Sequence, residues 1–405
     1  MKLKFFLMAT AAMTLATSCS SDAVVDDQQD ANAIQFSVTA GNASRAASYY
    51  CNNEKPSQFN VWAATDGKTY FENESFSQKG GTGNWTIDGD FARFWPSTEV
   101  SFFAVKNQTK YNGDVFADVA WNDGTPTIAF TAQKPVQTEA SKQQDLLYAY
   151  TKATKTADNV VNNKCVATLN FRHALSQVVF KAQNKNKNIY VEISEVQVAN
   201  LNTTGTFTFP TKATDNTSLN DKHNQSGVIA DNDESFGKWS GLGTPVAVTT
   251  TGEFTAVKAL GNGSIVNLTN NEGTERALKD YSLIVLPQTL TAWDHAAAPA
   301  TEGAYFKVKC LVKNVAKGDG LAATTDDVTL YDKYIYIPVN INWQVGKKYI
   351  YTFVFSEKGH AGYDEEGNNI LIPIEFNVTV DDFAKAQEGF NGTVDADNGN
   401  GNGNA

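Results

Sequence analysis

The sequence holds few of the residues that build metal centres, disulfide frameworks or strongly charged surfaces. Among its 405 residues there are 4 Cys and 4 His, only 19% are charged, and 33 basic side chains stand against 44 acidic ones. The net charge of −11 argues against a surface that binds nucleic acid or an anionic membrane. We therefore expect partners that are proteins or sugars, and no nucleic acid.

Cysteine is too sparse for a zinc site or a disulfide framework. Beyond the N-terminal Cys19, the chain has Cys51, Cys165 and Cys310, which lie more than a hundred residues apart and form no C-x-x-C pair. At most one disulfide can form among these three, and the sequence does not say which. Cys310 lies on the apolar face of an alternating run at 306–312, where a thiol is a small core side chain.

Sequence patterns that carry catalysis are also missing. The chain has no H-E-x-x-H, no G-x-S-x-G, no P-loop, and no G-x-G-x-x-G after a strand. His173 alternates with Leu169, Phe171 and Leu175, which favours a structural histidine. An acidic run at Asp395 begins like a calcium loop, but the twelfth position of such a loop falls beyond residue 405. The sequence therefore predicts no catalytic residue, no cofactor and no metal site.

The N-terminus has the pattern of an exported protein. Lys2 and Lys4 precede an apolar run at 5–16 and then small residues, so residues 1–18 are predicted to be a signal peptide. The apolar run is too short to span a bilayer as a stable helix. The small residues before Cys19 resemble a lipobox, which predicts that Cys19 carries the lipid anchor of the mature chain. Ordinary secretion with an incidental cysteine is the alternative.

The remaining sequence is typical of strands and turns. Residues 19–33 are polar and acidic, which predicts a disordered tether. Short alternating apolar runs bounded by Gly, Pro, Asn or Asp then recur along the chain. We predict an all-β, or β-dominated, fold with two β-sandwich domains at residues 34–163 and 164–388. The Gly- and Asn-rich tail at 389–405 is predicted to be disordered.

One alternating run is longer than the others. Its six apolar residues at every second position are Ile370, Ile372, Ile374, Phe376, Val378 and Val380. These eleven residues are about twice the usual strand length, and Pro373 lacks the N–H that a central strand donates, which favours an edge strand. Such a strand completes either the core of its own chain or the core of another chain.

Several motifs, taken in order, resemble one family. They are Ile34-x-Phe36 with Arg45 downstream, Phe59-x-Val61-Trp62-Ala63, Phe94-Trp95-Pro96, Phe102-Phe103-Ala104, Asp145-Leu146-Leu147-Tyr148-Ala149, Leu169-x-Phe171-x-His173-Ala174-Leu175-Ser176, Leu286-Pro287-Gln288-Thr289 and Trp343-x-x-Gly346-Lys347-x-Tyr349-x-Tyr351. This order is similar to that of the fimbrillin (Mfa-like) family, the type V pilins and related surface lipoproteins. The resemblance runs from about residue 34 to 383. One departure is Phe383, where the family pattern has Trp.

The resemblance implies two transthyretin-like β-sandwich domains in tandem and a lipoprotein anchored at the outer-membrane surface. For stalk subunits it also implies that an Arg-specific protease removes the first strand, and that a neighbouring subunit's strand fills the vacated groove. The cleaved bond would be Arg45–Ala46, because Arg45 is the only basic residue between Cys19 and Lys55. The displaced strand would carry Ile34, Phe36 and Val38. Alternatively Arg45 is a surface residue in a hairpin, because anchor and tip subunits of such systems can keep their first strand.

We expect a structural subunit of a type V fimbria, without catalysis, with a role in adhesion and with other fimbrillins as partners. The run at 370–380 is the candidate donor strand. Neither the place of the subunit in the fibre nor a receptor follows from the sequence. The alternative from another class is a surface lipoprotein that binds glycans. In that case exposed tryptophan side chains would stack on sugars, although most Trp in a β-sandwich belong to the core. The candidates for stacking are Trp62, Trp85, Trp121, Trp239 and Trp293.

Overall fold

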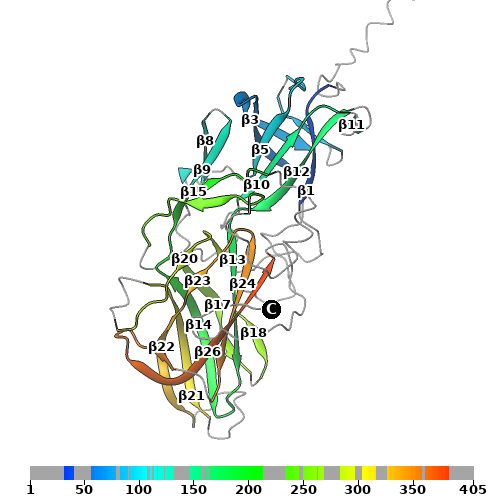
Figure 1. Cartoon of the computed structure of the whole chain (residues 1–405). Coiled ribbons are helices and arrows are strands. Elements are labelled where there is room, and N and C mark those ends of the chain that lie inside the picture. The colour runs from blue at the N-terminus through cyan, green and yellow to red at the C-terminus, as the bar shows by residue number, and fades with distance from the viewer. Residues whose placement is uncertain are drawn as a thin grey trace, which may run out of the picture.

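The computed structural model consists of β-strands throughout the part of the chain that it describes (Figure 1). The described residues are 32–40, 56–78, 83–89, 91–106, 110–111, 114–115, 117–122, 124–131, 146–156, 160–161, 164–212, 233–245, 250–261, 263–268, 283–296, 303–315, 326–357 and 361–382. They form 26 strands and no helix, which confirms the all-β prediction. Accordingly, these residues contain no helix that could cross a membrane. The predicted signal peptide, the C-terminal tail and most of the tether lie outside these ranges.

The first sheet closes into a ring. Its strands follow one another in the order β1-β4-β3-β2-β5-β10-β12, and β1 also pairs with β12 in parallel, so that the two ends of the order meet. A short strand, β11, pairs antiparallel with the beginning of β12. The strands are β1 (Gln35–Ala40), β2 (Gln58–Thr65), β3 (Lys68–Gln78), β4 (Trp85–Ile87), β5 (Val100–Lys106), β10 (Leu147–Ala153), β11 (Val160–Val161) and β12 (Lys164–His173).

The ring is apolar on two faces because a second sheet covers part of its outside. On β5, Phe102 and Ala104 face the inside of the ring, whereas Phe103 and Val105 pack outward in a separate cluster with Phe207. Burial on both faces explains why β2, β5 and β10 are apolar at consecutive positions rather than at every second one. The covering sheet consists of β8 (Ala117–Asn122), β9 (Thr125–Thr131), β15 (Thr204–Thr208) and β16 (Lys238–Ser240). Separately, β6 (Lys110–Tyr111) and β7 (Asp114–Val115) form a two-stranded sheet of their own.

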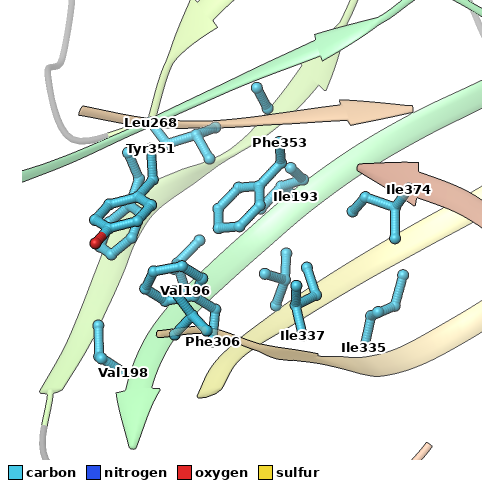
Figure 2. Packing of buried hydrophobic residues seen from close by; sticks show 14 of the residues in the cluster. Ile193, Val196, Val198, Leu268, Phe306, Ile335, Ile337, Tyr351, Phe353 and Ile374 are labelled. Atoms are coloured by element: carbon cyan, nitrogen blue, oxygen red, sulfur yellow. The ribbon is translucent and has the colours of Figure 1, made fainter. Parts of the chain in front are cut away.

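The C-terminal part forms two layers around the largest apolar cluster (Figure 2). Figure 2 shows Phe306, Tyr351 and Phe353 meeting between the layers, and the Phe306 and Tyr351 ring centres are 4.7 Å apart. One layer contains β13 (Ser176–Asn184), β18 (Ile265–Asn267), β19 (Leu283–Val285) and β24 (Lys347–Phe355). The other layer contains β14 (Ile189–Ala199), β17 (Thr250–Leu260), β21 (Tyr305–Asn314), β22 (Val328–Pro338) and β25 (Ala361–Tyr363). In addition, β20 (Thr289–Leu290) and β23 (Ile341–Asn342) form a separate two-stranded sheet.

The last strand, β26 (Asn369–Asp382), belongs to both layers. Its beginning pairs with β25, where Tyr363 lies opposite Asn369. From Ile374 to Asp382 it pairs antiparallel with β24. Figure 1 shows β26 sweeping across the lower part of the molecule from one layer to the other. One continuous strand therefore joins the two layers of this sandwich.

Strand pairing crosses the domain boundary that we expected at residue 164. Both β12 and β15 lie C-terminal to this boundary, yet β12 pairs with β1 and β10, and β15 pairs with β9. The chain passes from β12 to β13 through Ala174 and Leu175, where the Ala174 N–H donates to the Leu146 carbonyl at 2.8 Å. The β15–β16 segment then returns from the C-terminal part to cover the ring. That the two parts are transthyretin-like stays a prediction.

Candidate functional site: the first strand and its groove

Strand β1 forms because its sequence alternates between apolar and polar residues. Phe36 and Val38 are fully buried inside the ring, while Ser37 between them is half-buried. On one side β1 pairs parallel with β12 over six residues, from Gln35 opposite Val166 onward. On the other side its described pairing with β4 is a single bridge, between Phe36 and Trp85. The first strand is thus deeply buried but is held by few backbone pairs along one edge.

Phe36 is the side chain that anchors β1 in the ring. Its ring centre lies 4.8 Å from Phe76, 5.2 Å from Phe102 and 6.1 Å from Phe59, all in edge-to-face geometry. Edge-to-face aromatic pairs add about 0.5–1.5 kcal/mol each beyond the area that they bury. The groove that holds β1 is therefore an aromatic channel, and an occupant that fills it needs a large apolar side chain at this level.

The segment at 93–95 clamps the beginning of β1. The Ile34 N–H donates to the Arg93 carbonyl at 2.7 Å, and the Trp95 N–H donates to the Asn32 carbonyl at 3.1 Å. Trp95 in turn donates its indole N–H to the Cys165 carbonyl on β12 at 3.3 Å. Phe94-Trp95-Pro96 is one of the motifs that resemble the family, but the motif itself does not indicate a contact with the beginning of the chain's first strand. Because the contact joins residues about sixty positions apart, periodicity along the chain could not reveal it.

The predicted processing site lies outside the described residues. Arg45 and Ala46 fall in 41–55, between β1 and β2, and Cys19 lies before residue 32. The structure describes both strands that flank this segment: β1 ends at Ala40, and β2 begins at Gln58. Cleavage after Arg45 would therefore separate β1 from the remainder of the chain and leave every other described strand continuous with the rest.

The candidate donor strand sits in the chain's own sandwich, and its two halves differ. Ile370, Ile372 and Ile374 are at most 8% exposed and belong to the core. Phe376, Val378 and Val380 are only half-buried and pack against that core from its margin. From Ile374 onward, no described strand pairs with the edge of β26 that faces away from β24. The second half is thus an edge strand with a partly covered apolar face.

The cysteines are placed in separate cores. Cys165 packs inside the ring and Cys310 inside the C-terminal sandwich; both are 1% exposed and free. Burial raises the pKa of the Cys310 thiol, and the Asp332 charge raises it further, which disfavours the reactive thiolate. Cys51 lies outside the described residues.

No tryptophan forms an exposed sugar-stacking platform. Of the five candidates, Trp62, Trp85 and Trp293 are at most 3% exposed. The other two are half-buried and satisfied: the Trp121 indole donates to the Thr69 hydroxyl at 2.6 Å, and the Trp239 indole to the Ala174 carbonyl at 2.7 Å. These side chains therefore contribute packing, as most tryptophans in a sandwich do.

Histidines and carboxylates form no metal centre among the described residues. His173 ends β12 and lies opposite Leu147. His295 is exposed and stacks on Tyr363 with ring centres 4.2 Å apart. His223 and His360 lie outside the described residues.

A buried arginine fixes the covering segment to the ring, and sequence reasoning did not find it. Arg172 is 3% exposed; it donates to the Ser235 carbonyl and lies 4.8 Å from the centre of the Phe236 ring. Nearby, the Tyr148 hydroxyl accepts the Gly237 N–H at 3.1 Å. Burial raises the pKa of Tyr148, and the Arg172 charge opposes that rise. Arg172 is the second-last residue of β12, where the sequence pattern does not indicate whether a side chain is buried.

These features define an all-β protein whose first strand closes a ring and whose last strand joins the two layers of a second core. In a comparison with known families, residues 44–381 match the fimbrillin-like family. The match covers most of the 405 residues, so the chain belongs to the fimbrillin-like family. The matched range begins after β1, at residue 44, and ends one residue short of the end of β26.

A comparison with solved structures finds matches among proteins of Bacteroides and Parabacteroides species. A candidate cell adhesion protein of Bacteroides ovatus is 13% identical, with a TM-score of 0.44 and coverage of 88% of this chain and 99% of that one. A candidate cell adhesion protein of Parabacteroides distasonis is 8% identical, with a TM-score of 0.44 and coverage of 89% and 99%. The comparison with curated proteins finds no match.

Proposed function

We propose that the chain is a structural subunit of a type V fimbria at the outer-membrane surface, without catalysis and with a role in adhesion. In this proposal the chain is exported, anchored through Cys19 and trimmed after Arg45. Trimming removes β1, and a strand from a neighbouring subunit enters the vacated groove. Membership of the fimbrillin-like family supports the proposal. The single observation that carries it is the position of β1, which pairs with β12 at one edge and with β4 at the other and would be removed by cleavage between β1 and β2.

The vacated groove would be a strong acceptor. Loss of β1 leaves the backbone of β12 unpaired over six residues and uncovers Phe59, Phe76 and Phe102. An added strand regains the main-chain hydrogen bonds, and its alternate side chains fill the aromatic channel, which is how strand addition combines affinity with register. Exposure of both a sheet edge and an aromatic core makes the trimmed chain prone to bind the first suitable strand.

The proposed donor is the run at 370–380, because its apolar side chains recur at every second position. Each of the six contributes about 1.5–3 kcal/mol if fully buried, or about 9–18 kcal/mol before association and ordering costs. To donate, β26 must leave β24, and its half-buried second part is the easier part to release. The competing hypothesis is that β26 only closes its own sandwich.

Arg45 is expected to be the first site cut by an Arg-specific protease in the folded chain. The chain has four arginines: Arg45, Arg93, Arg172 and Arg276. Arg172 is buried, and Arg93 is ion-paired with Glu74 and accepts a hydrogen bond from the Ile34 N–H at its backbone carbonyl. Sequencing of the new N-terminus should give Ala46, and electron microscopy should then show filaments.

The matched variants are Arg45→Gln and Arg276→Gln. The first should abolish both trimming and filaments, while the second should leave both unchanged. Adding a peptide of residues 32–45 to the trimmed chain should suppress filaments by refilling the groove. Filaments that form equally well with Arg45→Gln would contradict strand removal.

Cys19→Ala is expected to release the protein from the membrane fraction into the medium. The reason is that acyl chains on Cys19 supply the membrane affinity in this proposal. Fractionation with immunoblotting measures the effect, and Cys51→Ala is the control that should stay membrane-bound. Unchanged retention of the Cys19→Ala chain would refute lipid anchoring.

A further inference from the structure

The beginning of β1 is held by residues 93–95, which we call the strap. Besides the two backbone hydrogen bonds between the strap and residues 32–34, an antiparallel bridge pairs Ala33 with Phe94. The residues under the strap are well covered, since Ala33 is 2% and Ile34 is 3% exposed. Three consecutive residues of the strap therefore meet three consecutive residues at the start of the first strand.

Side chains fasten the strap to the ring. The Arg93 Nε donates to the Glu74 carboxylate at 3.1 Å, and the Arg93 Nη2 donates to the same oxygen. The Tyr70 hydroxyl donates to the Phe94 carbonyl at 2.5 Å. Both Tyr70 and Glu74 belong to β3, whereas the Trp95 indole bonds to β12. Because β3 and β12 lie on opposite sides of β1 in the order of the sheet, the strap is tied to the ring on either side of the first strand.

The strap holds the end of β1 that lies away from the predicted cleavage site. Strand β1 begins at Gln35, next to the strap, and ends at Ala40, five residues before Arg45. After cleavage the strand could separate from β12 starting at Ala40, because no covalent link would hold that end. Residues 32–34 would separate last, because the hydrogen bonds of the strap lie at that end.

We propose that the strap is a latch that retains the first strand in its groove after the chain has been cut. The inference rests on the proposed trimming after Arg45, and it adds that trimming and release of β1 are separate steps. The retained fragment would carry the proposed anchor at Cys19. A cut chain would therefore stay at the membrane until the strap opens, and its groove would stay closed to other strands for the same time.

The latch would open through its two polar ties to β3. The Arg93 side chain is 41% exposed and the Glu74 side chain is 25% exposed, so water and salt reach their ion pair. Such pairs stabilise only modestly and are screened by salt. Trp95, by contrast, is 9% exposed and packs in the ring core against Phe102. The ion pair and the tyrosine hydrogen bond can therefore break while the core packing of the ring is kept.

Hydrogen exchange tests the latch in the untrimmed chain. A variant with Tyr70→Phe and Glu74→Gln loses both ties to β3 but keeps the backbone of the strap. Its amides at 34–38 should exchange about tenfold faster than those of the unaltered chain, because each lost tie contributes modestly and the two act together. Mass spectrometry of peptides covering 32–40 measures the rates. Raising NaCl from about 0.05 M to about 1 M should speed this exchange in the unaltered chain only, since the variant has no ion pair to screen.

The control is Glu234→Gln, which removes the ion pair between Lys212 and Glu234 on the segment between β15 and β16. It should leave exchange at 34–38 unchanged. Faster exchange confined to the first strand of the double variant supports the latch, and exchange at the rate of the control overturns it. An equal acceleration in β2, β5 and β12 also overturns it, because the changes then loosen the whole ring and not the strap.

The trimmed chain provides a second measurement. After cleavage, confirmed by a new N-terminus at Ala46, the fragment that ends at Arg45 should elute together with the ring in gel filtration. It should dissociate from the chain with Tyr70→Phe and Glu74→Gln with a half-life at least about tenfold shorter. Dissociation at equal rates from both chains would overturn the latch while leaving strand exchange intact. If no cleavage occurs at Arg45, the proposed function fails, and hydrogen exchange in the untrimmed chain still decides whether the strap holds the first strand.

Discussion

Phe36→Ala is expected to lower the free energy of unfolding of the untrimmed chain by about 3–5 kcal/mol. Phe36 is fully buried and meets Phe59, Phe76 and Phe102 edge to face. Alanine would leave a cavity in the middle of the ring core, because the surrounding strands are hydrogen-bonded and cannot close over it. Urea denaturation followed by tryptophan fluorescence measures the loss, since Trp85 and Trp95 pack in the same core.

The matched control is Ser37→Ala, one position along the same strand. Ser37 is only half-buried, so its replacement should change the free energy of unfolding by less than about 0.5 kcal/mol. After trimming, Phe36 is gone, and filaments from Phe36→Ala and unaltered chains should be indistinguishable. A loss below about 1 kcal/mol in the untrimmed chain would show that β1 is not anchored by this side chain.

Phe376→Asp is expected to abolish filament formation by the trimmed chain. As a donor residue Phe376 would be fully buried in the groove, and a carboxylate there loses the apolar contribution and costs desolvation in addition, so the contact weakens more than a hundredfold. In the monomer Phe376 is half-buried, 6.0 Å from the Phe306 ring and 6.3 Å from the Tyr351 ring. The carboxylate can still reach water there, so the monomer should lose only about 1–2 kcal/mol.

Ile372→Asp is the comparison that distinguishes a donor role of β26 from a role in the core of its own sandwich. Ile372 is 6% exposed, so an aspartate there should destabilise the monomer by about 4 kcal/mol or more. Thermal melting of monomers and electron microscopy of trimmed protein give the two readouts. If the Phe376→Asp monomer is as unstable as the Ile372→Asp monomer, β26 acts as a core strand throughout and the donor assignment is wrong.

Strand alternation predicted the most regular strands well and missed the irregular ones. The run at 370–380 falls within β26 at 369–382. Strand β3 was not predicted, and its geometry explains why. Phe71 and Phe76 are an odd number of residues apart, which in a regular strand places them on opposite faces. Both are nevertheless in the ring core, because the register with β2 shifts between them and Asn73 has a positive φ of 52°.

The Trp-x-x-Gly-Lys-x-Tyr-x-Tyr motif shows what a sequence pattern leaves unspecified. The Trp343 indole donates to the Tyr351 hydroxyl at 3.0 Å, and the Gln344 N–H donates to the Tyr349 hydroxyl at 2.8 Å. Gly346 has a φ of 65° and donates its N–H to the Leu175 carbonyl at the junction. The local spacing of the motif follows from these short-range bonds. Its partner Leu175 lies about 170 residues earlier, and pairing at that distance could not be predicted from periodicity.

In the export that we propose for this chain, the closed ring would protect strand edges that β1 covers. Sheet edges are where unrelated chains pair and precipitate, so a secreted protein with long open edges is at risk before it reaches its destination. In the described part of this chain, β1 covers β4 on one side and β12 on the other. In the export that we propose, the precursor would therefore keep these two strand edges paired until cleavage. The proposed cleavage after Arg45 would open both edges at once, and the place of exposure would then be set by the location of the protease and not by the stability of the fold.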